Sequence, residues 1–523
     1  MSQARNIAIV GGTLIDGTGS PPIPDSIILI EGERIAAVGE QVELEVTEGA
    51  EIIDASGGTV LPGLIDAHHH FLRMGIRMIT TVDLSGTGSI KEALGNIEDR
   101  VSETEEGGWI LGRGWDDSKW DERRYIDKGD LDPISPVNPV VLTRICGHMK
   151  TLNSKAMEIA GINRDTRNPQ GGQVDKTPDG DPTGVLRDAG QLIDPFIPQE
   201  TEEQAMEGLK EACNLALRLG CTGVHDAELN VDEINAYKQA LEEGILKVRV
   251  NMMWKSDLHP IMESLSLSPN RWEEMLRLGP AKLLIDGSLG ARTAALYEPY
   301  EDDISTKGLT MMTEEELTKK VKAIHGEDSQ VAVHAIGDYA IDLVLNAIEA
   351  ALREQPRKDH RHRIEHCELL STNQIERIHR LGVIASMQPN FAGEWSGPEG
   401  LYEARLGERR LRQNNPYRLL LDEGVRMPFG SDGMPFDPLY GIHSAVNHPI
   451  KDSRISIVEA VKGFTLDAAY ASFEEDIKGS IEPGKLADIT ILGKDLTEVS
   501  EEEIRDVPIR MTMVGGEILY PKG

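Results

Sequence analysis

The sequence predicts an α/β protein with a (β/α)₈ barrel of the TIM type, a small β-sandwich domain and an insertion after the first barrel strand. Three observations predict this architecture. Helical segments alternate with short apolar strands through residues 201–474, eight such strands can be counted when the earlier strand Leu64–His70 is included, and both ends of the chain contain short strands without helical periodicity. Such alternation is typical of parallel strands joined by helical crossovers.

Length and charge limit the classes of protein to consider. The chain has 523 residues, which at roughly 100–200 residues per domain predicts two to four units or one large barrel with additions. It carries 54 Lys and Arg against 88 Asp and Glu, a formal net charge of −34. This acidic balance argues against nucleic acid or an anionic membrane as a partner, because both bind clustered Lys and Arg.

Cysteine usage and hydropathy predict a cytoplasmic protein. The four cysteines lie far apart without a CxxC spacing, which does not suit a disulfide scaffold and fits a reducing compartment. The first twelve residues lack the apolar run of a signal peptide. No stretch approaches the ~18–20 apolar residues that are needed to span a bilayer, so we expect no membrane partner.

The two ends of the chain are expected to form one small β-sandwich domain, residues 1–62 and 475–523. Both ends contain short strand candidates separated by Gly, Pro and Asp. Chain ends often lie close together in folded domains, which makes a shared domain plausible on general grounds.

Residues 63–70 and 201–474 are expected to form the barrel. Three of its helices begin with the capping-box spacing, at Thr201 and Gln204, Thr313 and Glu316, and Ser371 and Gln374. The eight expected strands are Leu64–His70, Cys221–Asp226, Val248–Trp254, Lys282–Asp286, Val331–His334, Arg363–His366, Val383–Met387 and Arg426–Ser431. Residues 71–200 fit no single βα unit, so we expect an insertion on the side of the barrel where active sites lie.

The first barrel strand ends in a pattern that can bind metal. His68 and His70 are two residues apart on a strand, so both side chains point the same way. Two converging imidazoles can chelate one divalent ion, although an isolated HxH pair is as often an ordinary polar strand end. His69 has the opposite parity and is expected to pack, whereas Asp66 shares the parity of the ligands and could orient one of them.

Other strand ends strengthen the metal hypothesis. His334 ends the fifth strand, His366 the sixth and Asp432 follows the eighth, while Lys282 opens the fourth. The carboxyl ends of barrel strands surround one cavity. Four histidines and an aspartate at these ends therefore predict a shared metal site.

The chain resembles the metal-dependent amidohydrolase superfamily over nearly its whole length, and within it the branch that includes N-substituted formamide deformylase. The segments that carry the resemblance are Pro62–His70, Asp286–Ala294, Val333–Asp338, Arg363–Cys367 and Gly479–Asp488. The first and last of these segments are marks of the superfamily, and the middle three point to the branch.

The resemblance implies roles for the candidate ligands. His68 and His70 would bind the more buried metal, His334 and His366 a second one, and Asp432 would contact the first metal and the attacking water. Lys282 matches the position at which many members carry a carboxylated lysine that bridges two metals. We expect a divalent metal, zinc being the first choice, with either one or two ions per chain.

These residue types predict hydrolysis. A bound divalent ion lowers the pKa of its water from ~15.7 towards ~7. Asp432 is expected to act as general base and then as general acid on the departing nitrogen. The leading hypothesis is hydrolysis of a non-peptide carbon–nitrogen bond in an amide, an N-formyl compound or a cyclic amide. The alternatives are a mononuclear deaminase of an amino-substituted ring and a scaffold without catalysis.

Substrate contacts are expected from two regions. In the insertion, Trp115 is equally consistent with a cap over the substrate and with a packed core, and His148 could reach the reacting group. After the fourth strand, a loop that includes Ser288 should reach the cavity, and Arg292 is a candidate for binding an anionic group. We expect a small-molecule substrate, and a homo-oligomer is possible.

Overall fold

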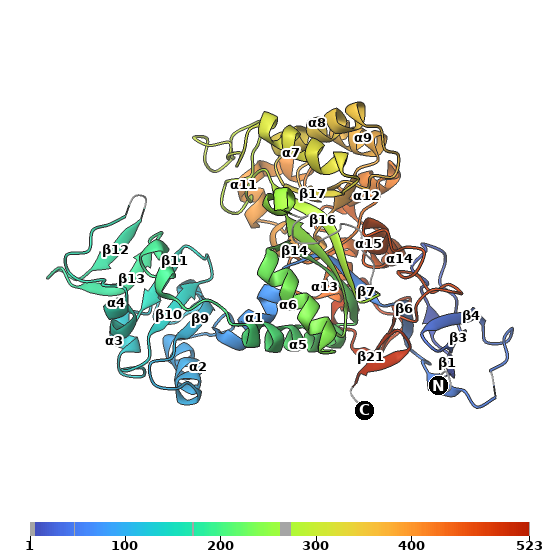
Figure 1. Cartoon of the computed structure of the whole chain (residues 1–523), viewed down its shortest axis with the longest axis horizontal. Coiled ribbons are helices and arrows are strands. Elements are labelled where there is room, and N and C mark those ends of the chain that lie inside the picture. The colour runs from blue at the N-terminus through green and yellow to red at the C-terminus, as the bar shows by residue number, and fades with distance from the viewer. Residues whose placement is uncertain (1–5, 47, 170–171, 262–273, 522–523) are drawn as a thin grey trace. The chain divides into compact units, whose positions relative to one another are not determined.

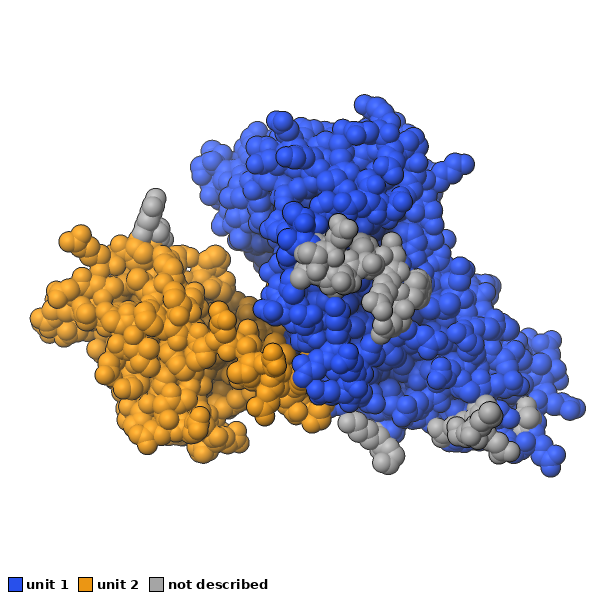
Figure 2. All heavy atoms as spheres, viewed as in Figure 1, with its two compact units in different colours: residues 1–72, 212–523 blue, residues 73–211 orange. Residues whose placement is uncertain are grey.

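The computed structural model describes the whole chain except residues 1–5, 47, 170–171, 262–273 and 522–523. The chain divides into two compact units, residues 1–72 with 212–523 and residues 73–211 (Figure 2). Two helices contain the chain boundaries between the units, α1 (Phe71–Thr80) and α5 (Glu202–Arg218). No described helix is long and apolar enough to cross a membrane.

In the first unit, both ends of the chain contribute to two β-sheets. One sheet has the order β4-β3-β1-β5 and the other the order β2-β6-β20-β21-β22. Buried apolar side chains from both sheets, such as Ile7, Ile28, Ile489 and Met513, form one core. Figure 1 marks both chain ends beside these strands. Their bounds are β1 Asn6–Val10, β2 Thr13–Leu14, β3 Ser26–Glu31, β4 Arg34–Glu40, β5 Glu51–Asp54, β6 Thr59–Pro62, β20 Ile489–Leu492, β21 Ile509–Val514 and β22 Glu517–Tyr520.

The centre of the first unit is a nearly closed barrel of parallel strands. Within the described residues it contains seven strands in the order β19-β18-β17-β16-β15-β14-β7. The bounds are β7 Leu64–His69, β14 Cys221–Leu229, β15 Arg249–Lys255, β16 Leu276–Leu284, β17 Val331–Ala335, β18 Arg363–His366 and β19 Ile384–Ser386. The α/β class is confirmed, whereas the expected count of eight strands is wrong.

The segment expected as the eighth strand closes the barrel without forming a regular strand. Its only ladder contact among the described residues is a parallel bridge between Met387 and Phe429. Its backbone nevertheless bonds to both edges of the sheet, because Met387 N donates to Pro428 O and Ala67 N donates to Phe429 O. Pro428 has no N–H to donate, which limits the ladder that this segment can form.

The fourth barrel strand begins earlier than the sequence predicts. Strand β16 starts at Leu276, so Lys282 lies near its carboxyl end and does not open the strand. Pro280 is accommodated beside a register shift between Met252 and Trp254 of the neighbouring strand, where a missing backbone donor is tolerated. Lys282 therefore lies towards the end of the barrel that carries the histidines.

Helices follow most of the barrel strands, and α7 and α8 lie against β17 (Figure 1). The predicted capping box at Thr313 is present, since its Oγ1 accepts a hydrogen bond from Glu316 N and Glu316 accepts one from Thr313 N. The helices of this unit beyond α5 are α6 Val231–Glu242, α7 Glu314–Gly326, α8 Asp338–Glu354, α9 Thr372–Leu381, α10 Pro389–Trp395, α11 Leu401–Leu411, α12 Tyr417–Asp422, α13 Pro438–Val446, α14 Ile457–Gly463 and α15 Leu466–Ala471.

The second unit, residues 73–211, has its own sheet with the order β12-β13-β11-β10-β9-β8. Trp115 and Trp120 are stacked in its core with ring centroids 5.5 Å apart. Its elements are β8 Thr81–Asp83, α2 Ile90–Glu103, β9 Ile110–Trp115, α3 Lys128–Leu131, β10 Val140–Arg144, β11 Met149–Leu152, α4 Ser154–Ile159, β12 Gln173–Lys176 and β13 Pro182–Arg187.

Candidate metal centre

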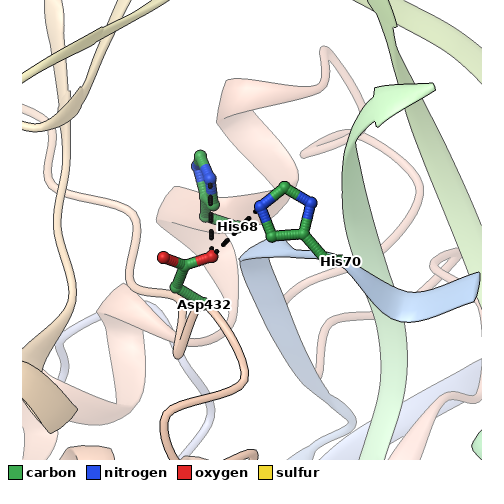
Figure 3. A group of neighbouring side chains, drawn as sticks. All are labelled: His68, His70 and Asp432. Carbon is green, nitrogen blue, oxygen red and sulfur yellow. Dashed lines mark ion pairs between the residues drawn. The ribbon is translucent and has the colours of Figure 1, made fainter. Parts of the chain in front are cut away.

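Three expected ligands converge beside the carboxyl end of β7. The Nε2 atom of His70 lies 3.4 Å from Asp432 Oδ1, and the Nε2 atom of His68 lies 4.0 Å from the same oxygen. Figure 3 shows both rings directed at the carboxylate. Potential ligand atoms of the three residues all lie within 4.8 Å of one another, which is the spacing of groups that can share one divalent ion.

Two further histidines lie beside this group. The His366 ring centroid is 4.8 Å from that of His68 and 4.4 Å from that of His334. His334 and His366 come from the neighbouring strands β17 and β18. The fold therefore brings together four histidines that are separated by up to 298 positions in the sequence.

Hydrogen bonds fix which ring nitrogen of three histidines is available to a metal. His68 Nδ1 lies 2.5 Å from Glu365 Oε2, His366 Nδ1 lies 2.8 Å from Gln388 Oε1, and His334 Nε2 lies 3.1 Å from the Gly287 carbonyl. Each oxygen can only accept, so each of these nitrogens carries the proton. The other nitrogen of each ring keeps its lone pair for a metal.

The carboxylate also fits a metal ligand. Asp432 Oδ1 is buried and receives no hydrogen bond from the described residues. A buried carboxylate oxygen without a donor is costly unless a cation occupies its neighbourhood. The donor set of imidazole nitrogens and a carboxylate oxygen suits zinc and related divalent ions.

Burial controls the protonation states of the candidate ligands. Burial lowers the pKa of His68 and His366 well below the usual histidine value, and lowers that of His334 to about 3. These rings are therefore neutral and able to ligate at neutral pH. Burial also raises the pKa of Asp432 to about 7.

Lys282 is buried near both groups of ligands. Its residue is 4% exposed, and the negative charges of Glu365, Glu228 and Asp432 act on its ammonium. Burial lowers its pKa. The positive charge of Lys282 acts on both His68 and His334, which places it close to the two sets of ligands.

Asp66 holds the backbone around the ligands. Its carboxylate accepts hydrogen bonds from His68 N at 3.1 Å and from Ser431 N at 3.0 Å. Because Ser431 directly precedes Asp432, this residue ties two ligands from distant segments together. The sequence suggested that Asp66 could orient a ligand ring, and the structure shows that it binds the ligand backbone.

The expected substrate contacts in residues 73–211 have different environments. Trp115 has no exposed surface and belongs to a hydrophobic core, which favours the packing alternative over a cap residue. His148 is 67% exposed at its side chain, and its Nδ1 lies 3.0 Å from Asp188.

The loop after β16 is braced by its own contacts. The guanidinium of Arg292 forms two hydrogen bonds with Asp302, of 2.8 and 3.0 Å, so its charge is already balanced by a carboxylate. Ser288 is exposed, and its Oγ accepts a hydrogen bond from Ala291 N. The residue before it, Gly287, is the one whose carbonyl contacts His334.

Sequence reasoning missed the residues that hold the ligand rings, Glu365, Arg363 and Gln388. Glu365 directly precedes His366, and in a regular strand their side chains would point to opposite faces. His366 instead has a φ of 69°, a conformation that is uncommon for residues other than glycine. This break in alternation lets neighbouring residues both face the site.

Comparison with known proteins gives the class to which this fold and site belong. Residues 51–520 match the model of the amidohydrolase family. A Bacillus subtilis (strain 168) protein named amidohydrolase YtcJ is 32% identical over 95% of this chain and 96% of its own length. The chain therefore belongs to the amidohydrolase family, and the expectation of a hydrolytic enzyme is confirmed.

Two other relatives cover the chain almost completely. The N-substituted formamide deformylase of Arthrobacter pascens is 29% identical over 100% of this chain and 99% of its own. A solved structure, an uncharacterized metal-dependent hydrolase from Pyrococcus furiosus, has a TM-score of 0.77 and 29% identity, and the match covers 95% of this chain and 100% of that one.

Proposed function

We propose that this enzyme hydrolyses a carbon–nitrogen bond outside peptides, in an amide, an N-formyl amine or a cyclic amide, with a divalent metal. The observation that carries the proposal is the convergence of His68, His70 and Asp432 on one point. The name of the Arthrobacter pascens relative, N-substituted formamide deformylase, makes N-formyl amines the first substrate class to test.

The residues divide into two metal positions. His68, His70 and Asp432 form the first position, and His334 with His366 forms the second. Lys282 lies close to both, which supports a bridging role as a carboxylated lysine. A divalent ion, zinc being the first to test, would supply a water of lowered pKa and polarise the substrate carbonyl.

Asp432 carries the proton transfers in this proposal. Its Oδ1 faces the ligand nitrogens and receives no hydrogen bond from the described residues, so it is available to accept a proton from the attacking water. The same oxygen would then return that proton to the departing nitrogen, because the base of the first step becomes the acid of the second.

A single-metal site is the second candidate, and it is linked to deamination of an amino-substituted ring. The observation that favours it is that His68, His70 and Asp432 form a three-ligand group without His334 or His366. Three protein ligands and one open position are sufficient for a catalytic zinc site.

Metal content and intact mass test these proposals on protein purified without chelators. We expect two divalent ions per chain, the added mass of one carboxyl group on Lys282, and hydrolysis of N-formyl amines that is lost on chelation and restored by zinc. One ion and an unmodified lysine would support the deaminase candidate. A protein that binds no ion after reloading with zinc or manganese would refute both.

A further inference from the structure

A buried ion pair lies directly behind the His68 ring. Arg363 Nε donates to Glu365 Oε1 at 2.7 Å, and His68 Nδ1 donates to Glu365 Oε2 at 2.5 Å. Glu365 and Arg363 are fully buried, and His68 is 1% exposed. Such burial makes the ion pair stable only if its geometry and hydrogen bonding are complete.

The hydrogen bonds of Arg363 meet that requirement. Its Nη2 donates to the Ala67 carbonyl at 2.7 Å and to Ser386 Oγ at 2.9 Å, and its Nη1 donates to His225 Nδ1 at 2.9 Å. Strands β7, β14 and β19 therefore all hold the guanidinium that β18 supplies. A planar group held on several sides gives the carboxylate of Glu365 a fixed position.

This arrangement determines the orientation of the His68 ring. A proton on Nδ1 leaves the lone pair on Nε2, the atom that lies 4.0 Å from Asp432 Oδ1. The carboxylate also makes the ring a stronger donor to a metal than a neutral partner would.

The other two supported rings are not hydrogen-bonded to a carboxylate. His366 donates to the amide oxygen of Gln388, and His334 donates to the backbone carbonyl of Gly287, with Asp286 Oδ1 farther away, 3.6 Å from His334 Nε2. Among these three ligands, a hydrogen bond to a carboxylate on the side away from the metal is therefore confined to His68, which belongs to the first metal position.

We propose that Arg363 and Glu365 are positioning residues that orient His68 and thereby make the first metal position bind its ion tightly. The inference rests on the proposed function only in requiring that this position binds a divalent ion. Neither residue touches the reacting atoms in this account.

The substitution Glu365→Gln tests the proposal. A carboxylate has two accepting oxygens, whereas an amide has one, so an NH₂ group would face either Arg363 Nε or His68 Nδ1, both of which are donors. Loss of such a supporting contact weakens metal binding by about 10–100-fold. We expect a loss of this size in the dissociation constant of Co²⁺, with a changed visible absorption spectrum of the bound ion.

The matched control is Glu368→Gln. Glu368 is buried to a similar extent, 2% exposed, and within the described residues its side chain makes no hydrogen bond to any of the four histidines. The same carboxyl-to-amide substitution is therefore made three residues away without altering the support of a ligand ring, and at pH 8 Glu368, whose pKa burial raises to about 7, is ionised as well. We expect Glu368→Gln to bind Co²⁺ as the unmodified enzyme does.

A second variant keeps the test valid if Glu365→Gln does not fold, as judged by circular dichroism and thermal unfolding. Arg363→Lys keeps the charge but cannot reproduce the planar contacts, and it should weaken Co²⁺ binding in the same direction. Wild-type affinity in the folded variants would overturn the proposal alone. An unmodified enzyme that binds no divalent ion would instead overturn the proposed function, and this inference with it.

Discussion

The metal affinity of this enzyme should depend on pH through Asp432. Burial raises the pKa of this carboxyl to about 7 in the metal-free site. A metal must displace the proton from a protonated ligand. The affinity is therefore complete above about pH 7 and is lost as the pH falls below it.

The magnitude follows from that pKa. One competing proton weakens binding tenfold for each pH unit below the pKa, so the loss is about 100-fold from pH 8 to pH 5. His68, whose pKa burial lowers well below its usual value, adds no proton of its own in this range. If Asp432 had the ordinary aspartate pKa near 3.9, it too would be almost fully deprotonated in this range, and the metal affinity would hardly change with pH.

The assay is competition between the enzyme and a chelator for Zn²⁺ at several pH values, with Asp432→Asn as the control. The variant cannot be protonated at this position, so the ratio of wild-type to variant affinity should fall tenfold per pH unit below about pH 7. A ratio that is constant from pH 8 to pH 5 would refute the reasoning and place the titrating group elsewhere.

Three further predictions concern folding and hydration. Asp286→Ala leaves three buried backbone N–H groups without their acceptor. At about 1–3 kcal/mol for each unsatisfied group, the free energy of unfolding of the first unit should fall by about 3–9 kcal/mol. Urea unfolding measures this free energy, and a loss below about 1 kcal/mol would contradict the prediction. Trp115→Ala should cost about 3–5 kcal/mol in residues 73–211, seen as faster proteolysis there, whereas unchanged cleavage would place the ring outside the core. On the neighbouring strands β14 and β15, three buried polar atoms have no hydrogen-bond partner among the described residues: His225 Nε2 and both polar side-chain atoms of Asn251. A crystal structure should therefore show ordered water bound to these atoms. A crystal structure without water there would contradict the prediction.

Much of the fold could be predicted from local patterns. The capping boxes and the alternation of helices with strands correctly indicated an α/β protein with a parallel barrel. The strand count and the start of β16 could not be predicted, because Pro280 and Pro428 interrupt the usual strand pattern. Neighbouring strands tolerate both prolines, through a register shift beside Pro280 and through bonds to other residues around Pro428.

The candidate site, too, could be predicted from the sequence only in part. The sequence by itself determined which side chains can bind a metal, because His68 and His70 alternate on a strand and the other candidates end later strands. Only the tertiary structure decided how these rings are oriented. Glu365 lies 297 positions from His68 in the sequence, and the positive φ of His366 removes the alternation from which side-chain directions are inferred. Contacts between distant strands depend on the closure of the barrel, and no local pattern encodes that closure.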